Sequence, residues 1–215
     1  MTTDSHDHPD PTTDPATHWE SRYAQSDRMW SGRVNPTTAD VISTLRPGRA
    51  LDLGCGEGGD AVWMAEQGWR VSAVDLSETA VARGEQVATA RGLGSLITWV
   101  VADAQTWQPD GTFDLVVASF FHSEVALERT QTLVRLASRI EPGGHLLLVS
   151  HAGPPPWATG AHHADLPTPE QELERLALPE HQWRRVIAET RTRPATGPDG
   201  EPAHLDDAVV LLRRQ

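Results

Sequence analysis

One segment of the sequence determines the expected fold, Ala50-Leu51-Asp52-Leu53-Gly54-Cys55-Gly56-Glu57-Gly58-Gly59-Asp60. Its first residues are a short apolar strand interrupted only by Asp52. The glycines that follow predict a tight turn that a ligand can approach closely. The helical spacing of residues 60–67 places a helix N-terminus, with its partial positive charge, beside that turn. The segment therefore predicts a strand, a glycine turn and a helix, with a ligand site at the turn.

The same alternation of strand and helix continues along the chain. Further strands are expected at 69–74, 96–101, 113–119 and 145–150, the last after a Pro-Gly-Gly turn, with helices after residue 16 and at 36–46, 77–91, 123–139 and 169–177. Near-continuous Val and Leu runs indicate strands that are buried on both faces of a parallel sheet. Residues 182–193 and 204–213 flank Asp199-Gly200 and predict an antiparallel hairpin. The fold class is α/β, a Rossmann-like doubly wound sheet of seven strands, mostly parallel with an antiparallel C-terminal hairpin.

The composition excludes several chemistries. All 18 basic residues are Arg, and the missing Lys excludes a P-loop and Schiff-base catalysis. The lone Cys55 excludes internal disulfides and thiol-based zinc sites. A net charge of -12 argues against nucleic acid as a partner, and no apolar run is long enough to cross a membrane. We expect a cytoplasmic monomer or homodimer with a flexible tail over residues 1–15 and one domain over 16–215.

The glycine turn fits two patterns. Residues 54–59 match the Gly-x-Gly-x-x-Gly fingerprint of dinucleotide-binding proteins. Residues 52–58, Asp-x-Gly-x-Gly-x-Gly, resemble motif I of the class I S-adenosylmethionine-dependent methyltransferases. Asp75 ends the next strand, where both families place an acid that accepts hydrogen bonds from ribose hydroxyls. A plain strand–helix connection, with Asp75 as a helix N-terminal charge, is the alternative that needs no ligand.

Three further segments favour the methyltransferase resemblance. Asp103 follows the third strand between Ala102 and Ala104, where the family has an adenine-binding acid and apolar neighbours, although a turn or N-cap role is the other interpretation. Residues 113–119 and 142–146 resemble the family's motif IV strand and the segment that follows. The start Trp19-Glu20-x-Arg22-Tyr23 and residues 30–36 are similar to a small-molecule branch, the tellurite-resistance and thiopurine-type methyltransferases, in which an N-terminal helix covers the cofactor.

The resemblance implies S-adenosylmethionine as the cofactor and S-adenosylhomocysteine as the product. Gly58 completes the turn, and Arg22, Arg33 or Tyr23 is expected to hold the cofactor's carboxylate. No metal is expected. The implied cofactor-binding residues are Tyr23, Trp30, Arg33, Asp52, Gly54, Cys55, Gly56, Asp75, Leu76, Ser77, Asp103, Ala104, Ser119 and Phe120.

The expected reaction is an in-line displacement that moves a methyl group to a small-molecule S, O, N or chalcogen nucleophile, with orientation as the protein's main contribution. His122 follows the fourth strand and is the candidate base, because an imidazole pKa of about 6.5 suits proton removal, although a structural role is the other interpretation. For His151, His162 and His163 a metal or substrate role stays open. Trp157, with the prolines 154–156, either walls the substrate side of the pocket or belongs to an ordinary surface loop.

Two alternatives remain to methyl transfer. One is a non-catalytic module that binds the cofactor. The other is an NAD-dependent oxidoreductase, which is disfavoured because short-chain dehydrogenases need a catalytic Tyr and Lys on one helix, whereas Lys is absent and Tyr23 precedes the glycine turn.

Overall fold

The computed structural model describes residues 13–157 and 166–215, so the expectations for residues 1–12, His162 and His163 lie outside the described residues. Two helices come first along the chain, α1 (Pro15–Ala24) and α2 (Pro36–Ile42). The elements that follow are β1 (Arg49–Leu53), α3 (Gly59–Glu66), β2 (Arg70–Asp75), α4 (Glu78–Ala90), β3 (Ile97–Val101), β4 (Phe113–Ser119), α5 (Arg129–Ala137), β5 (Ile140–His151), α6 (Pro169–Leu176), β6 (Trp183–Thr196) and β7 (Pro202–Arg214).

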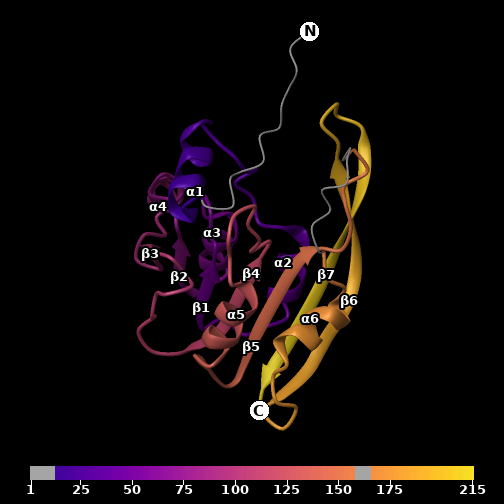
Figure 1. Cartoon of the computed structure of the whole chain (residues 1–215). Coiled ribbons are helices and arrows are strands. Elements are labelled where there is room, and N and C mark those ends of the chain that lie inside the picture. Colours follow the sequence, from indigo (N-terminus) through magenta and orange to yellow (C-terminus); the bar gives the residue numbers. More distant parts are fainter. Residues whose placement is uncertain (1–12, 158–165) are drawn as a thin grey trace.

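Within this described part, seven strands form one sheet in the order β3-β2-β1-β4-β5-β7-β6 (Figure 1). The strands are parallel except for β7, which runs antiparallel to both β5 and β6. The predicted fold class, with its antiparallel C-terminal hairpin, is confirmed. The carboxyl ends of β1, β2, β4 and β5 therefore meet at one edge of the sheet, which is where ligands bind in open α/β folds.

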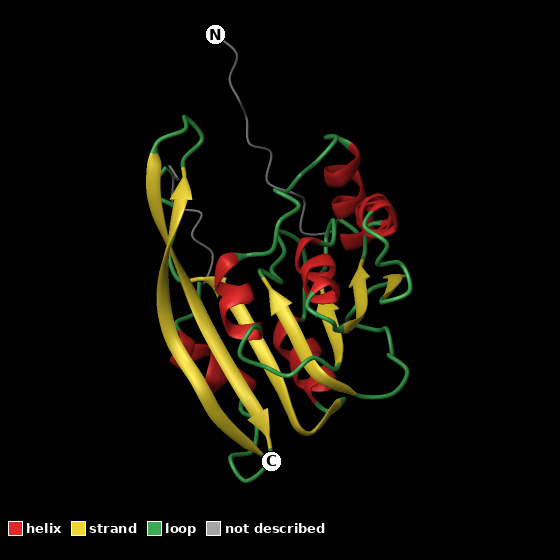
Figure 2. Cartoon of the chain, turned by 180° about the vertical axis from the view of Figure 1, so that it is seen from behind, coloured by secondary structure: helices red, strands yellow, loops and turns green. Residues whose placement is uncertain are grey.

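Helices cover both faces of the sheet (Figure 2). Side chains of α2, α3 and α4 share one buried core with the sheet, and those of α5 and α6 share the other. Successive strand residues alternate between these cores, so Ala50 packs in the first and Leu51 in the second. This two-sided burial explains why the strands read as almost uninterrupted apolar runs.

Three element boundaries differ from the prediction by four residues or more. The second helix was expected over residues 36–46, but α2 ends at Ile42, after which the amides of Thr44 and Leu45 bond three residues back in a turn. The fifth helix was expected from residue 123, but α5 begins at Arg129, because Ser123 and Glu128 are held by Trp19 and Gln105 in a non-helical segment. The fifth strand was expected from residue 145, but β5 begins at Ile140. The Pro-Gly-Gly segment lies within β5, where the register with β4 shifts.

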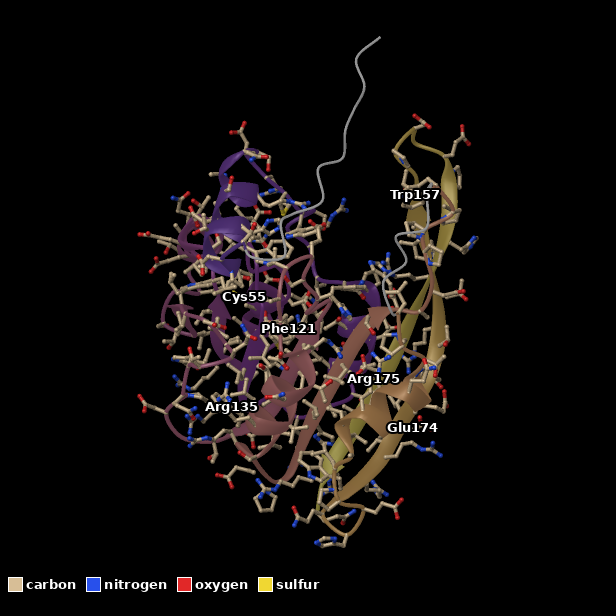
Figure 3. The ribbon with its side chains drawn as sticks, viewed as in Figure 1. Cys55, Phe121, Arg135, Trp157, Glu174 and Arg175 are labelled. Carbon is tan, nitrogen blue, oxygen red and sulfur yellow. The ribbon has the colours of Figure 1, made fainter. Side chains whose placement is uncertain are left out.

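The hairpin of β6 and β7 projects beyond the rest of the sheet (Figure 1). Trp157 lies beside its turn, since a side chain added at Gly197 would lie 3.4 Å from the Trp157 ring (Figure 3). Trp157 is 38% exposed. Among the helices of residues 13–157 and 166–215, none has the length and apolar character needed to span a membrane.

Candidate active site

The glycine turn after β1 has a backbone that only glycine adopts readily. Gly54, Gly56 and Gly58 have φ values of 64°, 51° and 79°. A side chain at Gly54 would lie 2.7 Å from the Phe121 ring, and one at Gly56 would lie 2.8 Å from the Tyr23 hydroxyl oxygen. Both the conformation and the close neighbours therefore exclude side chains at these two positions.

Asp75 connects the end of β2 to this turn. Its carboxylate accepts hydrogen bonds from the amide nitrogen of Gly56 and from that of Ser77, each at 2.9 Å. Ser77 caps α4 by accepting a bond from the amide of Ala80 at 3.1 Å, so Leu76 lies between an acid and a helix cap. Burial raises the pKa of Asp75 above its ordinary value. Asp75 thus has the structural role at the helix start and also lies at the turn, where a ribose would bind.

Asp52 and Asp60 are two neighbouring acids beside the turn, and burial disfavours the charged form of each. Asp52 is 2% exposed, and its Oδ2 has no hydrogen-bond partner among the described residues. Burial, with the negative charges of Asp60 and Asp75, raises the pKa of Asp52 well above its ordinary value. Burial also raises the pKa of Asp60, which accepts hydrogen bonds from the Asn35 amide at 3.0 Å and from the Ser119 hydroxyl. A cationic ligand group would relieve this charge.

Cys55 lies within the turn (Figure 3). Its amide donates to the carbonyl of Val74 at 3.0 Å, which joins the turn to β2. Burial, with the nearby acids Asp75 and Asp52, raises the pKa of the Cys55 thiol well above its ordinary value. A thiol that stays protonated is a poor nucleophile, so Cys55 fills space here.

Helix α1 bridges the two sides of the turn. Glu20 accepts hydrogen bonds from the hydroxyls of Ser77, at 2.6 Å, and Thr79, both at the start of α4. One residue earlier, the Trp19 indole donates to the Ser123 hydroxyl at 3.1 Å, beyond the end of β4. The helix therefore crosses the sheet edge between β2 and β4, the position of a cofactor cover.

The residues in α1, and in the segment that follows it, that were expected to bind the cofactor differ in their burial and in their partners. Tyr23 is buried, its hydroxyl accepts a hydrogen bond from the Trp30 indole at 3.0 Å, and its pKa is raised mainly by burial. Trp30 itself is 54% exposed. Arg33 is exposed, with its backbone against Gly59. Arg22 is paired with Glu124.

Glu57 and Glu20 were not predicted from the sequence. Glu57 is 8% exposed and accepts hydrogen bonds from the Trp30 amide, at 2.9 Å, and from Arg83, at 3.0 Å. An acid inside a glycine turn was the available signal for Glu57. For Glu20 the signal was its place between the two aromatic residues of the first helix.

Asp103 and Ala104 follow β3. Asp103 accepts a hydrogen bond from the Gln105 amide at 2.8 Å, which is the turn role that the sequence left open. Ala104 is buried, and Arg135 of α5 donates to its carbonyl and to that of Trp107 (Figure 3). Arg135 thus holds this segment against α5. The adenine-binding role of Asp103 stays a prediction.

Phe120 and His122 follow β4 at the same edge of the sheet. Phe120 has a φ of 53° and donates its amide to the Val149 carbonyl at 2.7 Å. Its ring centroid lies 4.5 Å from that of His151. Burial, with Arg129 and His151 nearby, lowers the pKa of His122 to about 4, and its Nε2 is buried without a partner in the described part of the chain. His122 is therefore a weak proton acceptor in this state.

A buried polar cluster that the sequence did not reveal surrounds Asp207. This residue is 0% exposed and accepts hydrogen bonds from the Thr37 hydroxyl and from Arg193 Nε, each at 2.7 Å. Thr38, the next residue of α2, shares a 2.9 Å hydrogen bond with Ser119. Two consecutive threonines of α2 therefore join this cluster to Ser119 at the end of β4. The one signal was an acid directly before the apolar run 208–212.

No group of three or more His, Cys, Asp or Glu side chains within 13–157 and 166–215 is arranged to hold a metal ion. The residues present do fit S-adenosylmethionine. The buried, unpartnered Oδ2 of Asp52 suits a positively charged ligand group, and the glycine turn keeps side chains away from the backbone beside it.

Comparison with known proteins agrees with this geometry. The family model for a methyltransferase domain matches residues 50–144. Probable thiol methyltransferase 2 of Arabidopsis thaliana is 30% identical over 75% of this chain and 71% of its own length. Thiocyanate methyltransferase 1 of the same plant is 29% identical over 65% of each chain, so these matches span about two thirds of the relatives.

A solved structure shows the same fold. The 1,6-didemethyltoxoflavin-N1-methyltransferase of Burkholderia thailandensis, determined with bound 1,6-didemethyltoxoflavin and S-adenosylhomocysteine, has a TM-score of 0.67 at 21% identity. It covers 100% of this chain and 98% of its own. That structure supports the fold, and the thiol methyltransferase match at 30% identity confirms the resemblance read from the glycine turn. The chain belongs to the class I S-adenosylmethionine-dependent methyltransferases.

Proposed function

We propose that this protein transfers a methyl group from S-adenosylmethionine to a small-molecule nucleophile, with sulfur as the acceptor atom. The observation that carries the cofactor assignment is the pair of neighbouring acids at the glycine turn, the buried Asp52 and the half-buried Asp60. Asp52 and Asp60 lie where a dinucleotide would place its pyrophosphate, at the N-terminus of α3. Two negative groups there repel phosphate and attract the ammonium of a methionine moiety, which disfavours the oxidoreductase alternative.

The proposed roles follow from position. The backbone of Gly54 and Gly56 receives the methionine part, with Asp52 balancing its ammonium group directly or through water. Asp75 holds the ribose, Leu76 contacts the adenine, and Asp103 binds the adenine edge. Ser119 and Phe120 border the place of the transferred methyl.

When bound, S-adenosylmethionine supplies a methyl group that its positively charged sulfur has already activated. The chain's residues then align the acceptor with that methyl and exclude water, and alignment alone contributes about 7–11 kcal/mol in well-oriented reactions. Helix α1 helps to exclude water, because it bridges Ser77 and Ser123 across the turn. We further propose that residues 16–215 act as one domain, since a single sheet joins their strands.

A sulfur acceptor is supported by the relatives named for thiocyanate and thiol methylation. The acceptor side of the edge also suits a small, polarisable group. Phe120 and His151 offer ring faces there, and the Arg193 guanidinium lies 6.0 Å from the Phe120 ring centroid. The guanidinium of Arg193 would attract a sulfur anion, and polarisable sulfur makes favourable contacts with aromatic rings.

The test is release of S-adenosylhomocysteine in the presence of thiocyanate, hydrosulfide, a simple thiol, a phenol and an amine. We expect the sulfur acceptors to give the highest kcat/KM. Preference for the phenol or amine would reject sulfur but keep methyl transfer. Tight cofactor binding without turnover of any acceptor would favour the non-catalytic module.

A further inference from the structure

We propose that His151 and Asp207 form a proton-accepting pair in the acceptor site, in which His151 takes the acceptor's proton and Asp207 positions the imidazole. This inference rests on the proposed methyl transfer and deepens it. It assigns the role of base to His151, at the end of β5, instead of to His122. This base is needed only for acceptors that carry a proton.

The sheet register brings the two residues together. His151 and Asp207 are directly opposed partners in the antiparallel pairing of β5 and β7. The Nδ1 atom of His151 lies 3.9 Å from Oδ1 of Asp207. Both atoms are buried and lack a hydrogen-bond partner among the described residues. A small movement of the imidazole toward the carboxylate would form a hydrogen bond between these two atoms. Leaving both unpaired in the interior costs free energy.

This pairing sets the tautomer of His151. If Nδ1 carries the proton and donates it to Asp207, Nε2 is left with its lone pair as an acceptor. The His151 side chain is 40% exposed although its Nδ1 is buried, so the exposed part lies elsewhere on the residue. The ring centroid also lies 4.5 Å from that of Phe120, with the two planes tilted by 46°, at the border of the proposed methyl position.

Asp207 is itself held firmly. Thr37 and Arg193 donate to its other oxygen, Oδ2, each at 2.7 Å, which leaves Oδ1 directed to the histidine. Three elements thus fix one carboxylate, α2, β6 and β7. Such support is what a positioning residue needs to keep a ring in one orientation.

The charges around His151 keep it neutral before reaction. Burial lowers its pKa, Asp207 on β7 opposes that shift, and Arg193 on β6 adds to it. His122, after β4, also faces it and has a lowered pKa of its own. The His151 side chain is 40% exposed, whereas the Nε2 atom of His122 is buried. The proposal requires that Nε2 of His151 faces the acceptor.

The proposed step is balanced. His151 Nε2 takes the proton of the acceptor X–H as the electron pair on X forms the new bond to the methyl carbon. The carbon–sulfur bond of the sulfonium breaks, its electron pair stays on sulfur, and S-adenosylhomocysteine results. The protonated ring, stabilised by Asp207, then releases its proton to solvent.

The kinetic experiment compares acceptors with and without a proton. For a thiol of pKa about 8.5, only about 3% is ionised at pH 7, so a base can contribute up to about 30-fold. His151→Gln should lower kcat/KM for such a thiol about 10-fold to 30-fold at pH 7. The loss should vanish near pH 10, and thiocyanate, which has no proton to lose, should react within about 2-fold of wild type.

His181→Gln, in an exposed histidine before β6, is the matched control and should behave as wild type. Equal losses of His151→Gln with the thiol and thiocyanate would overturn the proposal, as would a loss that persists at pH 10. Calorimetry of S-adenosylhomocysteine with His151→Gln should match wild type, so that a failure of cofactor binding is separated from a failure of the pair.

A second readout needs no turnover. In ¹⁵N NMR of the free wild-type protein at pH 7, His151 should be neutral with the proton on Nδ1. Asp207→Asn, if it folds, should shift the acid limb of the thiol pH profile to lower pH, because the carboxylate no longer favours the charged ring. A proton on Nε2 in wild type would overturn the proposal even if no acceptor is turned over.

Discussion

Asp52 and Asp207 are both buried acids at the carboxyl edge of the sheet, but their surroundings are opposite. Asp207 has an arginine and a threonine hydroxyl on one oxygen. Asp52, like Asp207, has one unpartnered oxygen, but the charged neighbours that shift its pKa are the acids Asp60 and Asp75. The carboxylate of Asp207 is therefore balanced by an arginine within the fold. The carboxylate of Asp52 has a partner of opposite charge only when a cationic ligand binds.

This difference separates the two halves of the site. A compensated acid stabilises the folded chain and holds its neighbours in place, which suits a positioning role. An uncompensated acid weakens the empty protein and becomes favourable only when a cation arrives. The cofactor half is therefore electrostatically incomplete without its ligand, while the acceptor half is already organised.

The largest effect is expected from removing the compensated acid. Asp207→Ala leaves Arg193 buried without its partner and should lower the free energy of unfolding by about 3–5 kcal/mol in urea denaturation. The exposed pair of Arg91 and Glu66 is the control, and Glu66→Gln should cost less than about 1 kcal/mol. Similar small losses in both variants would contradict the comparison.

The opposite sign is expected at Asp52. Asp52→Asn removes an uncompensated charge, so the unfolding free energy of the cofactor-free protein should rise, by on the order of 1 kcal/mol. Binding of S-adenosylmethionine should weaken by about 1.5–3 kcal/mol, or about 10-fold to 150-fold, in calorimetry. Asp40→Asn, on the exposed side of α2, should change neither quantity. A stability loss at Asp52 with unchanged affinity would refute its assignment.

The acids at the turn also predict a pH dependence. Burial raises the pKa values of Asp52, Asp60 and Asp75 in the folded state above the ordinary value of about 4. Their contribution to stability is fully present below that unfolded pKa and is lost as pH rises through the raised folded pKa. The melting temperature of wild type should therefore fall relative to Asp52→Asn as pH rises above about 4. A constant difference between the two proteins would contradict this.

The smallest effect concerns the cover. Glu20→Gln weakens the hydrogen bonds of α1 to Ser77 and Thr79 and should lower cofactor affinity about 3-fold to 10-fold, equivalent to about 0.5–1.5 kcal/mol. Stability should change little, since α1 lies at the edge of the sheet. Gln25→Glu, an exposed change at the end of the same helix, is the control. Equal affinity in both variants would show that α1 does not close over the cofactor.

The cofactor half was predictable from the sequence because its parts are contiguous. Strand, glycine turn and helix follow one another in residues 49–66, and a positive φ at Gly54 or Gly56 is a local requirement. Asp75 was also placed at this turn, since it ends the next strand and accepts a hydrogen bond from the Gly56 amide, while its ribose role stays a prediction. The parallel sheet then followed from the alternation of elements.

The acceptor half was not predictable in the same way. The pairing of His151 with Asp207 depends on the register between β5 and β7, which are separated by α6 and β6. Thr37 reaches the same carboxylate from a helix near the start of the chain. The start of α5 was missed for a related reason, because a contact with Trp19 holds Ser123 outside the helix. These features depend on contacts between residues far apart in the sequence. The periodicity of apolar residues does not predict such contacts.

The most direct test is calorimetry of the wild-type protein with S-adenosylmethionine and with NAD at pH 7. The negative charge at Asp52 and Asp60 predicts saturable binding of S-adenosylmethionine, weakened by Asp52→Asn, and no measurable binding of NAD. Preferential binding of NAD, or S-adenosylmethionine affinity that is unchanged in Asp52→Asn, would contradict the assignment of the glycine turn to a cationic cofactor.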